Sequence, residues 1–476
     1  MDSFFRFIFL CQLLVIILLN SFCTEPEIVN ININAGPFKD HYITLGYYHG
    51  IKTYFKDSIY INNTGYADYR TTLHDGLYFI VLPDSSVHEI MISEASEYSV
   101  QVMQERLKSS IIISGSISAE AYNNYLHEAE KIYTEIDSLK KAVIEKTVKG
   151  SEKSRIFKEV KILESNVDKL KNRYALKYKG TLAGNYLQSQ ISVAVPGFEE
   201  YHDSESYDSI KWFLSLNYYK ENYLKNIIWE DERLIYTPVI DQKTNMYLNR
   251  IVRQNTIEIT QAIDNILSNI KNQEMKKYVL KLLTDKYYSD KHTPLSEYAY
   301  IYLIKNYYFT GYAPWISNDE MEFLNQEYNK VKPTILHEKA PDFKIFESLS
   351  NKSQLDSINA HYTVIIFWDF NCSFCRKVIE QLKKLSVKYQ YLDIAYVTVY
   401  TGNETDKWKQ YAKSTFPRNW FNTYQTSDQR IADWYNISLT PTLFLLNNKK
   451  AIQDKNLTVT ELDSIFLKEL QKTDFN

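Results

Sequence analysis

Hydrophobic and polar positions divide the chain into three regions with different periodicities. Between Glu27 and about Ser116, apolar residues recur at every second position, and short turn signals such as Asp75-Gly76 separate the runs. A period of two places alternate side chains on one face of a strand, so the pattern is typical of half-buried strands joined by tight turns. We therefore predict a small antiparallel β-domain, a sandwich, over residues 26–117.

This β-domain shows no catalytic constellation in its sequence. Its histidines, His41, His49, His74 and His88, fall at no spacing typical of metal ligands. We interpret them as structural residues and expect a scaffold or docking role for the domain.

Residues 118–335 change to a helical period, with apolar side chains at steps of three and four residues. The segment Ala119–Tyr178 is interrupted at Val148–Ser151, which predicts two long antiparallel helices with solvated, charged faces. A second helical block begins near Ser209. Its aromatic residues recur at helical spacing, which favours a packed core, with a concave client-binding surface as the alternative.

The last region, residues 336–476, alternates between strand-like apolar runs and amphipathic segments. The predicted strands are Phe343–Phe346, Tyr362–Trp368, Asp393–Val399 and Thr442–Leu446, and the predicted helices begin at Cys372 and cover Lys407–Ser414, Arg430–Tyr435 and Thr458–Leu470. Such alternation predicts a sheet covered by helices. The chain is thus expected to be multidomain, with an N-terminal antiparallel β-domain, an all-α middle region and a C-terminal α/β domain.

Length and charge narrow the class of protein. The 476 residues, 45% hydrophobic and 24% charged, suit about two to four globular domains. A net charge of −3 favours neither nucleic acid nor an anionic membrane surface as a partner.

The first 23 residues are typical of an export signal. Arg6 supplies a positive end, and Phe7–Leu19 is apolar apart from Gln12. The apolar run is too short to predict a transmembrane span, so we expect export to the periplasm or cell envelope. Simple cleavage is favoured over a lipid anchor at Cys23, because Phe22 stands where lipoprotein signals usually carry a small residue.

The chain has four cysteines, and Cys11 and Cys23 fall in the predicted signal. The folded part therefore keeps Cys372 and Cys375, which frame Ser373-Phe374. Without a third thiol there is no structural disulfide to form, which indicates that this pair was kept for chemistry.

The cysteine pair follows an apolar strand and opens a helix, whose spacing predicts an apolar face of Phe374, Val378, Ile379, Leu382 and Leu385. A helix N-terminus stabilises a thiolate, because its unpaired N–H groups and its dipole favour a negative charge. We therefore predict that Cys372 attacks a client disulfide and that Cys375 resolves the mixed disulfide.

Two other interpretations of Cys-x-x-Cys are weaker. A closed zinc site needs two further ligands, and the nearest histidines, His337 and His361, are single and remote in sequence. A permanent disulfide across so short a loop would remove little entropy from the unfolded chain. We expect neither a metal nor an organic cofactor.

A second motif supports the redox interpretation. Thr440-Pro441-Thr442 opens an apolar strand, and Trp368 precedes the cysteines at the end of another. This is the arrangement of the thioredoxin fold, whose proline is expected to be cis and to expose the Thr440 backbone beside the thiols. An extended client chain can pair with that edge. The expected catalytic residues are Cys372, Cys375, Pro441 and Glu404, and the expected docking residues are Trp368, Thr440, Ser373 and Phe374.

The segment from Ala340 to the C-terminus resembles the TlpA-like, cytochrome-maturation type of thioredoxin-fold oxidoreductase. The resemblance rests on Ala340-Pro341-Asp342-Phe343, Phe367-Trp368-Asp369, Cys372-Ser373-Phe374-Cys375-Arg376, Trp420-Phe421-Asn422, Tyr435-Asn436-Ile437 and Thr440-Pro441-Thr442. The upstream β-domain, the helical region and Trp315 look like the N-terminal regions of such proteins in certain Gram-negative bacteria. The resemblance implies a reductant that a membrane-bound thiol electron donor regenerates.

Departures from the family pattern concern the carboxylates. Thioredoxin carries a buried Asp in the strand before its cysteines, and the matching residue here is Ile366. TlpA-like proteins use a Glu after the following strand, a place that Glu404 fits, which implies a proton relay to Cys375. A plain loop or capping role for Glu404 is equally open, and Asp369 is the rival carboxylate.

The sequence therefore predicts an exported thiol–disulfide oxidoreductase that reduces or isomerises disulfides of envelope proteins. The main alternative is an envelope binding or scaffold protein whose thioredoxin-like domain responds to redox state. A further alternative is an oxidase that donates disulfides, because the Ser373-Phe374 dipeptide leaves the redox potential undetermined.

Overall fold

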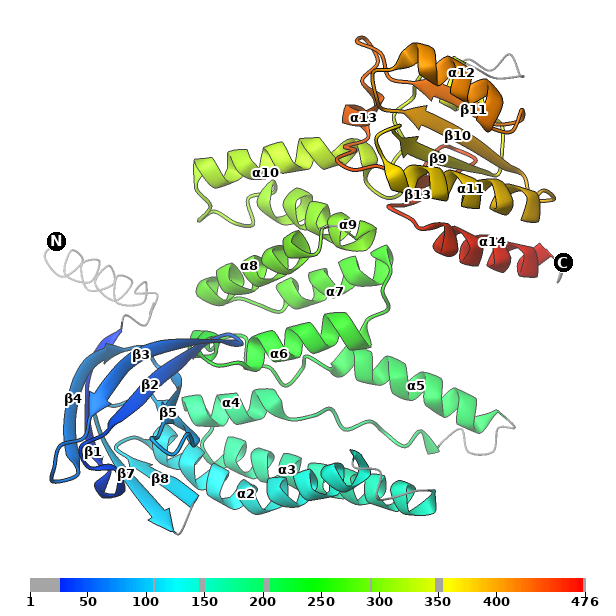
Figure 1. The fold of residues 1–476 in the computed structure, drawn as a ribbon. Coiled ribbons are helices and arrows are strands. Elements are labelled where there is room, and N and C mark those ends of the chain that lie inside the picture. The colour runs from blue at the N-terminus through cyan, green and yellow to red at the C-terminus, as the bar shows by residue number, and fades with distance from the viewer. Residues whose placement is uncertain are drawn as a thin grey trace, which may run out of the picture. The chain divides into compact units, whose positions relative to one another are not determined.

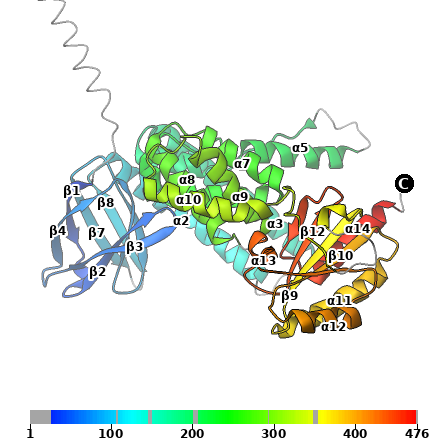
Figure 2. The same ribbon diagram turned by 90° about the horizontal axis from the view of Figure 1, so that it is seen from above.

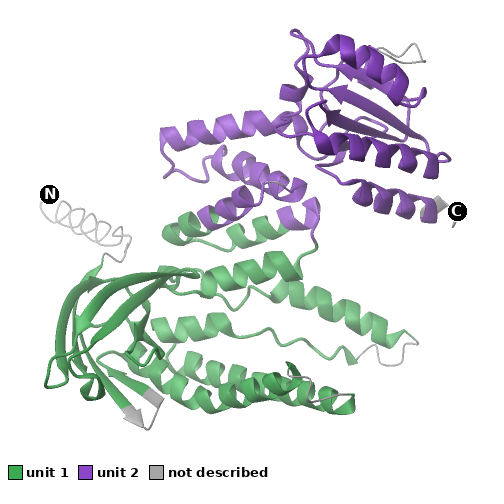
Figure 3. Ribbon diagram, in the orientation of Figure 1, with its two compact units in different colours: residues 1–253, 261–280 green, residues 254–260, 281–476 purple. Residues whose placement is uncertain are grey.

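The computed structural model describes residues 26–105, 108–144, 150–199, 206–291, 293–346 and 354–473 (Figure 1). The chain divides into two compact units, residues 1–253 with 261–280 and residues 254–260 with 281–476 (Figure 3). The predicted export segment, with Cys23, lies outside the described residues. Over the part that is described, no helix combines the length and the apolar character needed to cross a membrane.

The first unit begins with a β-sandwich of two four-stranded sheets. The strands are β1 (Glu27–Asn34), β2 (Tyr42–His49), β3 (Lys52–Tyr60), β4 (Tyr66–Leu73), β5 (Gly76–Val81), β6 (Val87–Ile92), β7 (Glu97–Glu105) and β8 (Lys108–Ser114), with a single 3₁₀ turn η1 (Gly36–Phe38). The strand orders are β4-β1-β7-β8 and β3-β2-β5-β6. The predicted sandwich is confirmed, and its strand pairs are antiparallel except β1 with β7, which run parallel.

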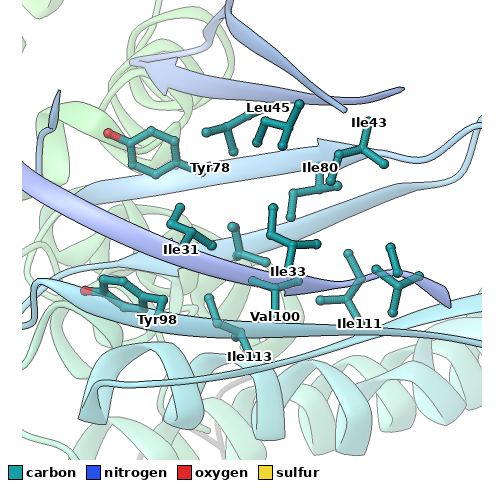
Figure 4. Packing of buried hydrophobic residues seen from close by; sticks show 14 of the residues in the cluster. Ile31, Ile33, Ile43, Leu45, Tyr78, Ile80, Tyr98, Val100, Ile111 and Ile113 are labelled. Atoms are coloured by element: carbon teal, nitrogen blue, oxygen red, sulfur yellow. The ribbon is translucent and has the colours of Figure 1, made fainter. Parts of the chain in front are cut away.

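The alternating apolar residues fill the space between the two sheets. Side chains from both inner faces meet there, among them Ile31 and Val100 from one sheet and Leu45 and Ile80 from the other (Figure 4). Because successive residues of a strand point to opposite faces, the period of two in the sequence becomes this core.

The rest of the first unit is helical. Its elements are α2 (Ile117–Ile144), α3 (Ser151–Lys177), α4 (Leu182–Gln190), α5 (Tyr207–Asn222), η3 (Glu232–Tyr236), α6 (Val239–Met246) and the π-helical turn η4 (Tyr247–Ile251). The predicted pair of long antiparallel helices is confirmed by α2 and α3, which share a small apolar core of Ile136, Ile156, Val160 and Val167. Two further helices, α7 (Thr256–Ser268) and α8 (Gln273–Ser289), contribute residues to both units.

The second unit joins short helices to the C-terminal domain. The helices are α9 (Pro294–Leu303), η5 (Ile304–Tyr308), α10 (Asn318–Val331) and η6 (Lys332–Thr334). The domain contains η7 (Leu355–Ser357), β9 (Tyr362–Trp368), α11 (Ser373–Lys388), β10 (Ile394–Tyr400), α12 (Thr405–Thr415), β11 (Phe421–Tyr424), α13 (Ile431–Trp434), β12 (Thr442–Asn447), β13 (Ile452–Lys455) and α14 (Val459–Thr473).

The C-terminal sheet has the strand order β11-β10-β9-β12-β13. Strands β9, β10 and β11 are parallel, whereas β12 and β13 join antiparallel. Side chains of α11, α12 and α14 pack on one face of this sheet with Val364 and Ile366, and Figure 2 shows α11 and α12 on the same side of the sheet. The other face packs against Ile431 and Tyr435 and against the segment around Phe343. These layers confirm the predicted α/β domain.

In the C-terminal sheet, the sequence does not predict β11 and β13, and one predicted strand is wrong. The short strands β11 and β13 carry too few alternating residues to be recognised. Phe343–Phe346 forms a single bridge, between Lys344 and Gln354, instead of a strand. The backbone N–H of Lys344 donates instead to the side-chain oxygen of Gln429, at 2.7 Å, so a side chain takes the place of a neighbouring strand.

Candidate active site

Cys372 stands at the junction between β9 and α11. It is the N-cap residue of α11, and its Sγ accepts a hydrogen bond from the backbone N–H of Cys375 at 3.0 Å. The two cysteines form a disulfide with a Cα–Cα distance of 5.3 Å. In the reduced state the same N–H would donate to a Cys372 thiolate, so the helix start stabilises the attacking form of the sulfur.

The Thr440-Pro441 segment reaches the cysteines because β12 runs antiparallel to β9. Thr442 pairs with Phe367, which places the start of β12 beside the end of β9. The Thr440–Pro441 peptide bond is cis, as predicted. The Thr440 carbonyl oxygen lies 3.3 Å from Cys372 Sγ, so this backbone borders the disulfide directly.

The two sulfurs differ in their surroundings. Cys372 is half-buried, whereas Cys375 is fully buried in the same apolar cluster as Ile366 and Val378. A client sulfur can therefore approach Cys372, and a charged Cys375 would lack solvation. This asymmetry fits an attacking first cysteine and a resolving second one.

Phe374 corrects the predicted apolar face of the helix. The sequence analysis places it with the buried residues of α11, yet its side chain is 57% exposed. The buried face begins instead with Cys375 and continues through Val378, Ile379 and Leu382. Phe374 lies in the first helical turn, which leaves its ring in solvent beside the disulfide, together with exposed Ser373.

Leu439 is a residue that the sequence analysis missed. Its side chain is 78% exposed, and it immediately precedes Thr440. This leucine adds exposed apolar surface next to the backbone segment at the disulfide. Its position one residue before the Thr-Pro motif is the signal that could have found it.

Trp368 also requires a correction. Its side chain is only 1% exposed, so it offers no surface on which a client can dock. The indole ring packs against Phe370, Tyr400 and Tyr411, with ring centroids 5.1 to 5.3 Å apart. These aromatic contacts support the turn that carries Cys372 from within the domain, and sequence analysis did not identify the three partner rings.

Asp369 shapes the turn before the cysteines. Its Oδ1 accepts a hydrogen bond from the N–H of Asn371 at 2.7 Å, and its carbonyl oxygen accepts one from the N–H of Cys372 at 3.3 Å. A Cβ on Gly402 would lie 2.2 Å from Asp369 Oδ2 and 2.3 Å from the Tyr400 hydroxyl. The glycine thus lets the carboxylate and the phenol approach the same point.

Glu404 lies at the N-cap position of α12 and is exposed. Its carboxylate forms an ion pair with Lys407 at 2.9 Å, while its backbone N–H donates to the Tyr400 hydroxyl at 3.2 Å. Burial raises the pKa of Tyr400, and the charges of Asp369 and Glu404 act in the same direction. The relay between Glu404 and Cys375 stays a prediction.

The histidines considered for a zinc site make other contacts. The imidazole of His337 is hydrogen-bonded to Thr256 at 2.9 Å, and the ring of His361 packs against that of Tyr362. Within the described ranges, no group of three or more His, Cys, Asp or Glu side chains is arranged to hold a metal ion.

Part of the C-terminal domain matches a known protein family. Residues 359–452 match a family model described as thioredoxin-like. This segment contains both cysteines and Pro441, so the C-terminal domain is a thioredoxin-like domain. No curated protein matches the chain.

Solved structures with similarity include three from bacteria. A thioredoxin-like protein from Bacteroides caccae is 22% identical and covers 53% of this chain and 92% of its own, with a TM-score of 0.40. A domain of a possible thiol-disulfide isomerase from Cytophaga hutchinsonii is 23% identical and covers 30% and 99%, with a TM-score of 0.27. The thioredoxin domain of a thiol-disulfide oxidoreductase from Bacteroides vulgatus is 21% identical and covers 28% and 96%, with a TM-score of 0.26.

Proposed function

We propose that this protein is an exported thiol–disulfide oxidoreductase of the TlpA-like type, which reduces or isomerises disulfides of envelope proteins. The observation that supports it best is the Cys372–Cys375 disulfide at the start of α11, with the Thr440 carbonyl oxygen 3.3 Å from Cys372 Sγ. Export rests on the sequence of residues 1–23. A membrane-bound thiol electron donor is part of the proposal, since each reduction of a client disulfide consumes the reduced pair.

The reaction proceeds in two exchange steps. The Cys372 thiolate attacks one sulfur of a client disulfide, forming a mixed disulfide and releasing the other client sulfur as a thiolate that takes a proton from water. Cys375 then loses its proton and attacks Cys372 Sγ, which forms the Cys372–Cys375 disulfide and releases the second client thiol. Two electrons pass in total from the cysteine pair to the client, whose two thiols take one proton from water and the one that Cys375 releases.

The client is proposed to lie along the surface formed by Phe374, Leu439 and the Thr440 backbone. An extended peptide beside the start of β12 can pair with exposed backbone groups, as in other cases of strand addition. The exposed Phe374 ring and Leu439 side chain would add apolar contact area without fixing the client's sequence.

Reduction of insulin by the purified protein tests the proposal. The protein reduced with dithiothreitol is expected to precipitate the insulin B chain faster than dithiothreitol alone, and Cys372→Ala is expected to remove the acceleration. Equal rates for the two proteins would overturn the enzyme proposal and favour the binding or scaffold alternative. A measured potential above about −150 mV would instead favour an oxidase.

A further inference from the structure

A cavity in the first unit, which does not contain the cysteine pair, is lined by cationic and amide side chains. It has a volume of about 570 Å³, within the usual range for small-molecule sites. Its walls come from α3, α4, the end of α5, α6 and η4, and Figure 1 shows α4 between the α2–α3 hairpin and α6. The charged side chains of the lining are Lys171, Lys243 and Arg250, and none of the described residues that line it carries a carboxylate.

The ammonium group of Lys243 is held in place by its neighbours. Its Nζ donates to the Ile191 carbonyl oxygen at 3.3 Å and lies 5.1 Å from the centroid of the Tyr223 ring. An ammonium has three N–H donors, and the bond to Ile191 uses one. The remaining donors can serve a ligand in the cavity.

Lys171 brings a second positive charge to the same cavity. Its side chain is 13% exposed, and its Nζ lies 3.9 Å from Asp168, too far for a direct hydrogen bond. Burial lowers the pKa of Lys171, and burial and the charge of Lys171 lower the pKa of Lys243 to about 8. Two neighbouring partly buried ammonium groups destabilise each other unless an anion lies between them.

The backbone around the cavity supplies an independent sign of function. Val252 N–H donates to the Tyr247 carbonyl at 3.0 Å, which makes η4 a π-helical turn. Such turns are rare and occur frequently at functional sites. The amide side chains that line the cavity are Gln190, Gln242, Asn245 and Asn249. Amide groups can complete the hydrogen bonds of an oxyanion that cations hold in place.

We propose that this cavity binds a small organic anion with at least two oxyanion groups, carboxylate or phosphate, between Lys171, Lys243 and Arg250. The cations neutralise the oxyanions, and the amides fix their orientation. The ring of Tyr223 and the side chain of Met246 offer an apolar wall to the carbon skeleton of the ligand. The site does not depend on the cysteine chemistry proposed above.

Isothermal titration of the full chain with citrate and, separately, with inorganic pyrophosphate tests the proposal. Saturable binding with one ligand per chain is expected for at least one probe. Tighter binding of pyrophosphate would indicate a phosphorylated ligand, and tighter binding of citrate a polycarboxylate. Absence of saturable binding by both probes at low ionic strength would overturn the proposal.

Variants connect the binding to the cavity. Lys171→Met and Lys243→Met are each expected to weaken binding about tenfold, since a hydrogen bond to a charged group is lost. Lys169→Met is the matched control, because Lys169 is exposed on the same helix and does not line the cavity. Its affinity should equal that of the unaltered protein. Affinity unchanged in both cavity variants would overturn the proposal.

A measurement on the unaltered protein covers the case in which the variants fail to fold. Acetylation of each lysine is followed by mass spectrometry with and without the anion. The anion is expected to slow acetylation of Lys243 and Lys171 but not that of Lys169. Equal protection of the three lysines, or none, would contradict the assignment.

Discussion

The Thr440 carbonyl oxygen lies 3.3 Å from Cys372 Sγ, although 68 residues separate the two in sequence. The contact arises because β12 is antiparallel to β9 and begins where β9 ends, with Thr442 opposite Phe367. A client backbone that pairs beside Thr440, as we propose, would thereby be brought to the half-buried sulfur. Cys375, by contrast, is buried in the apolar cluster that contains Ile366 and Val378.

The difference between the two sulfurs predicts that Cys375→Ser traps a client. Cys372 can still attack, but without the resolving thiol the mixed disulfide persists. Reduced Cys375→Ser mixed with an oxidised peptide should therefore give a stoichiometric adduct by mass spectrometry under non-reducing conditions, and dithiothreitol should release it.

Cys372→Ser serves as the control for trapping. Its remaining thiol, Cys375, is buried, so it should form adducts at least an order of magnitude more slowly. Equal adduct formation by the two variants would show that burial does not set the order of attack.

The contacts of the two carboxylates predict a larger role for Asp369 than for Glu404. Asp369→Ala removes the hydrogen bond to Asn371 N–H in the turn before Cys372, which should slow insulin reduction several-fold. Glu404→Gln alters an exposed ion pair with Lys407 and should change the rate by less than about twofold. Rates of mixed-disulfide resolution at several pH values would check both. A selective loss of resolution in Glu404→Gln would establish the relay instead.

Exposed apolar side chains beside the disulfide predict how clients are held. Replacing Phe374 or Leu439 by Ser should raise the KM for an oxidised peptide about fivefold, because about 1 kcal/mol of apolar contact is lost, with kcat nearly unchanged. Tyr391→Ser is the control, since Tyr391 is 87% exposed and belongs to the turn after α11. Equal effects of all three changes would argue against a local docking surface.

A buried ion pair in the second unit predicts a large stability effect. Lys455 of β13 and Glu297 of α9 are bound to each other, and their side chains are 5% and 12% exposed. Glu297→Ala would leave a buried ammonium without its partner and should lower the free energy of unfolding by about 3–5 kcal/mol. Denaturant unfolding measures the change. Glu380→Ala, which breaks the more exposed pair with Lys383, should cost less than about 1 kcal/mol.

The sequence is most informative where the structure depends on residues that are close together along the chain. The strand Tyr362–Trp368 and the helix after Cys372 follow from local periodicity and are confirmed to the residue or nearly so. The cis bond at Pro441 was inferred from the motif. Periodicity, however, assigns Phe374 to the buried face because it lies four residues before Val378, whereas its side chain is 57% exposed.

Contacts between residues far apart in the chain could not be predicted from the sequence. In the sequence, Tyr400 and Tyr411 look like ordinary strand and helix residues, and no feature of the adjacent sequence indicates that they pack on Trp368. The ion pair between Glu297 and Lys455 joins residues 158 positions apart. Lys171 likewise belongs to a helix that was predicted to have a solvated, charged face, and its place in the wall of the cavity depends on the packing of α3 with α4 and α6.

The anion site predicts that binding depends on pH. A ligand held by Lys243 needs its ammonium form, whose pKa is lowered to about 8 by burial and by Lys171. Affinity should therefore be full near pH 6.5 and fall as the pH rises through about 8, with proton uptake on binding above that value. The other charged or titratable groups around Lys243 are Asp168 and Lys171 of α3, Arg250 of η4 and Tyr223. Burial raises the pKa of Tyr223 to about 12, so its phenol stays neutral over this pH range.

Titrations of pyrophosphate at pH 6.5 and 9.5, in buffers of different ionisation enthalpy, measure both the change in affinity and the proton uptake. Lys243→Met should show a weaker dependence, and an affinity of the unaltered protein that does not change with pH would place the anion away from Lys243.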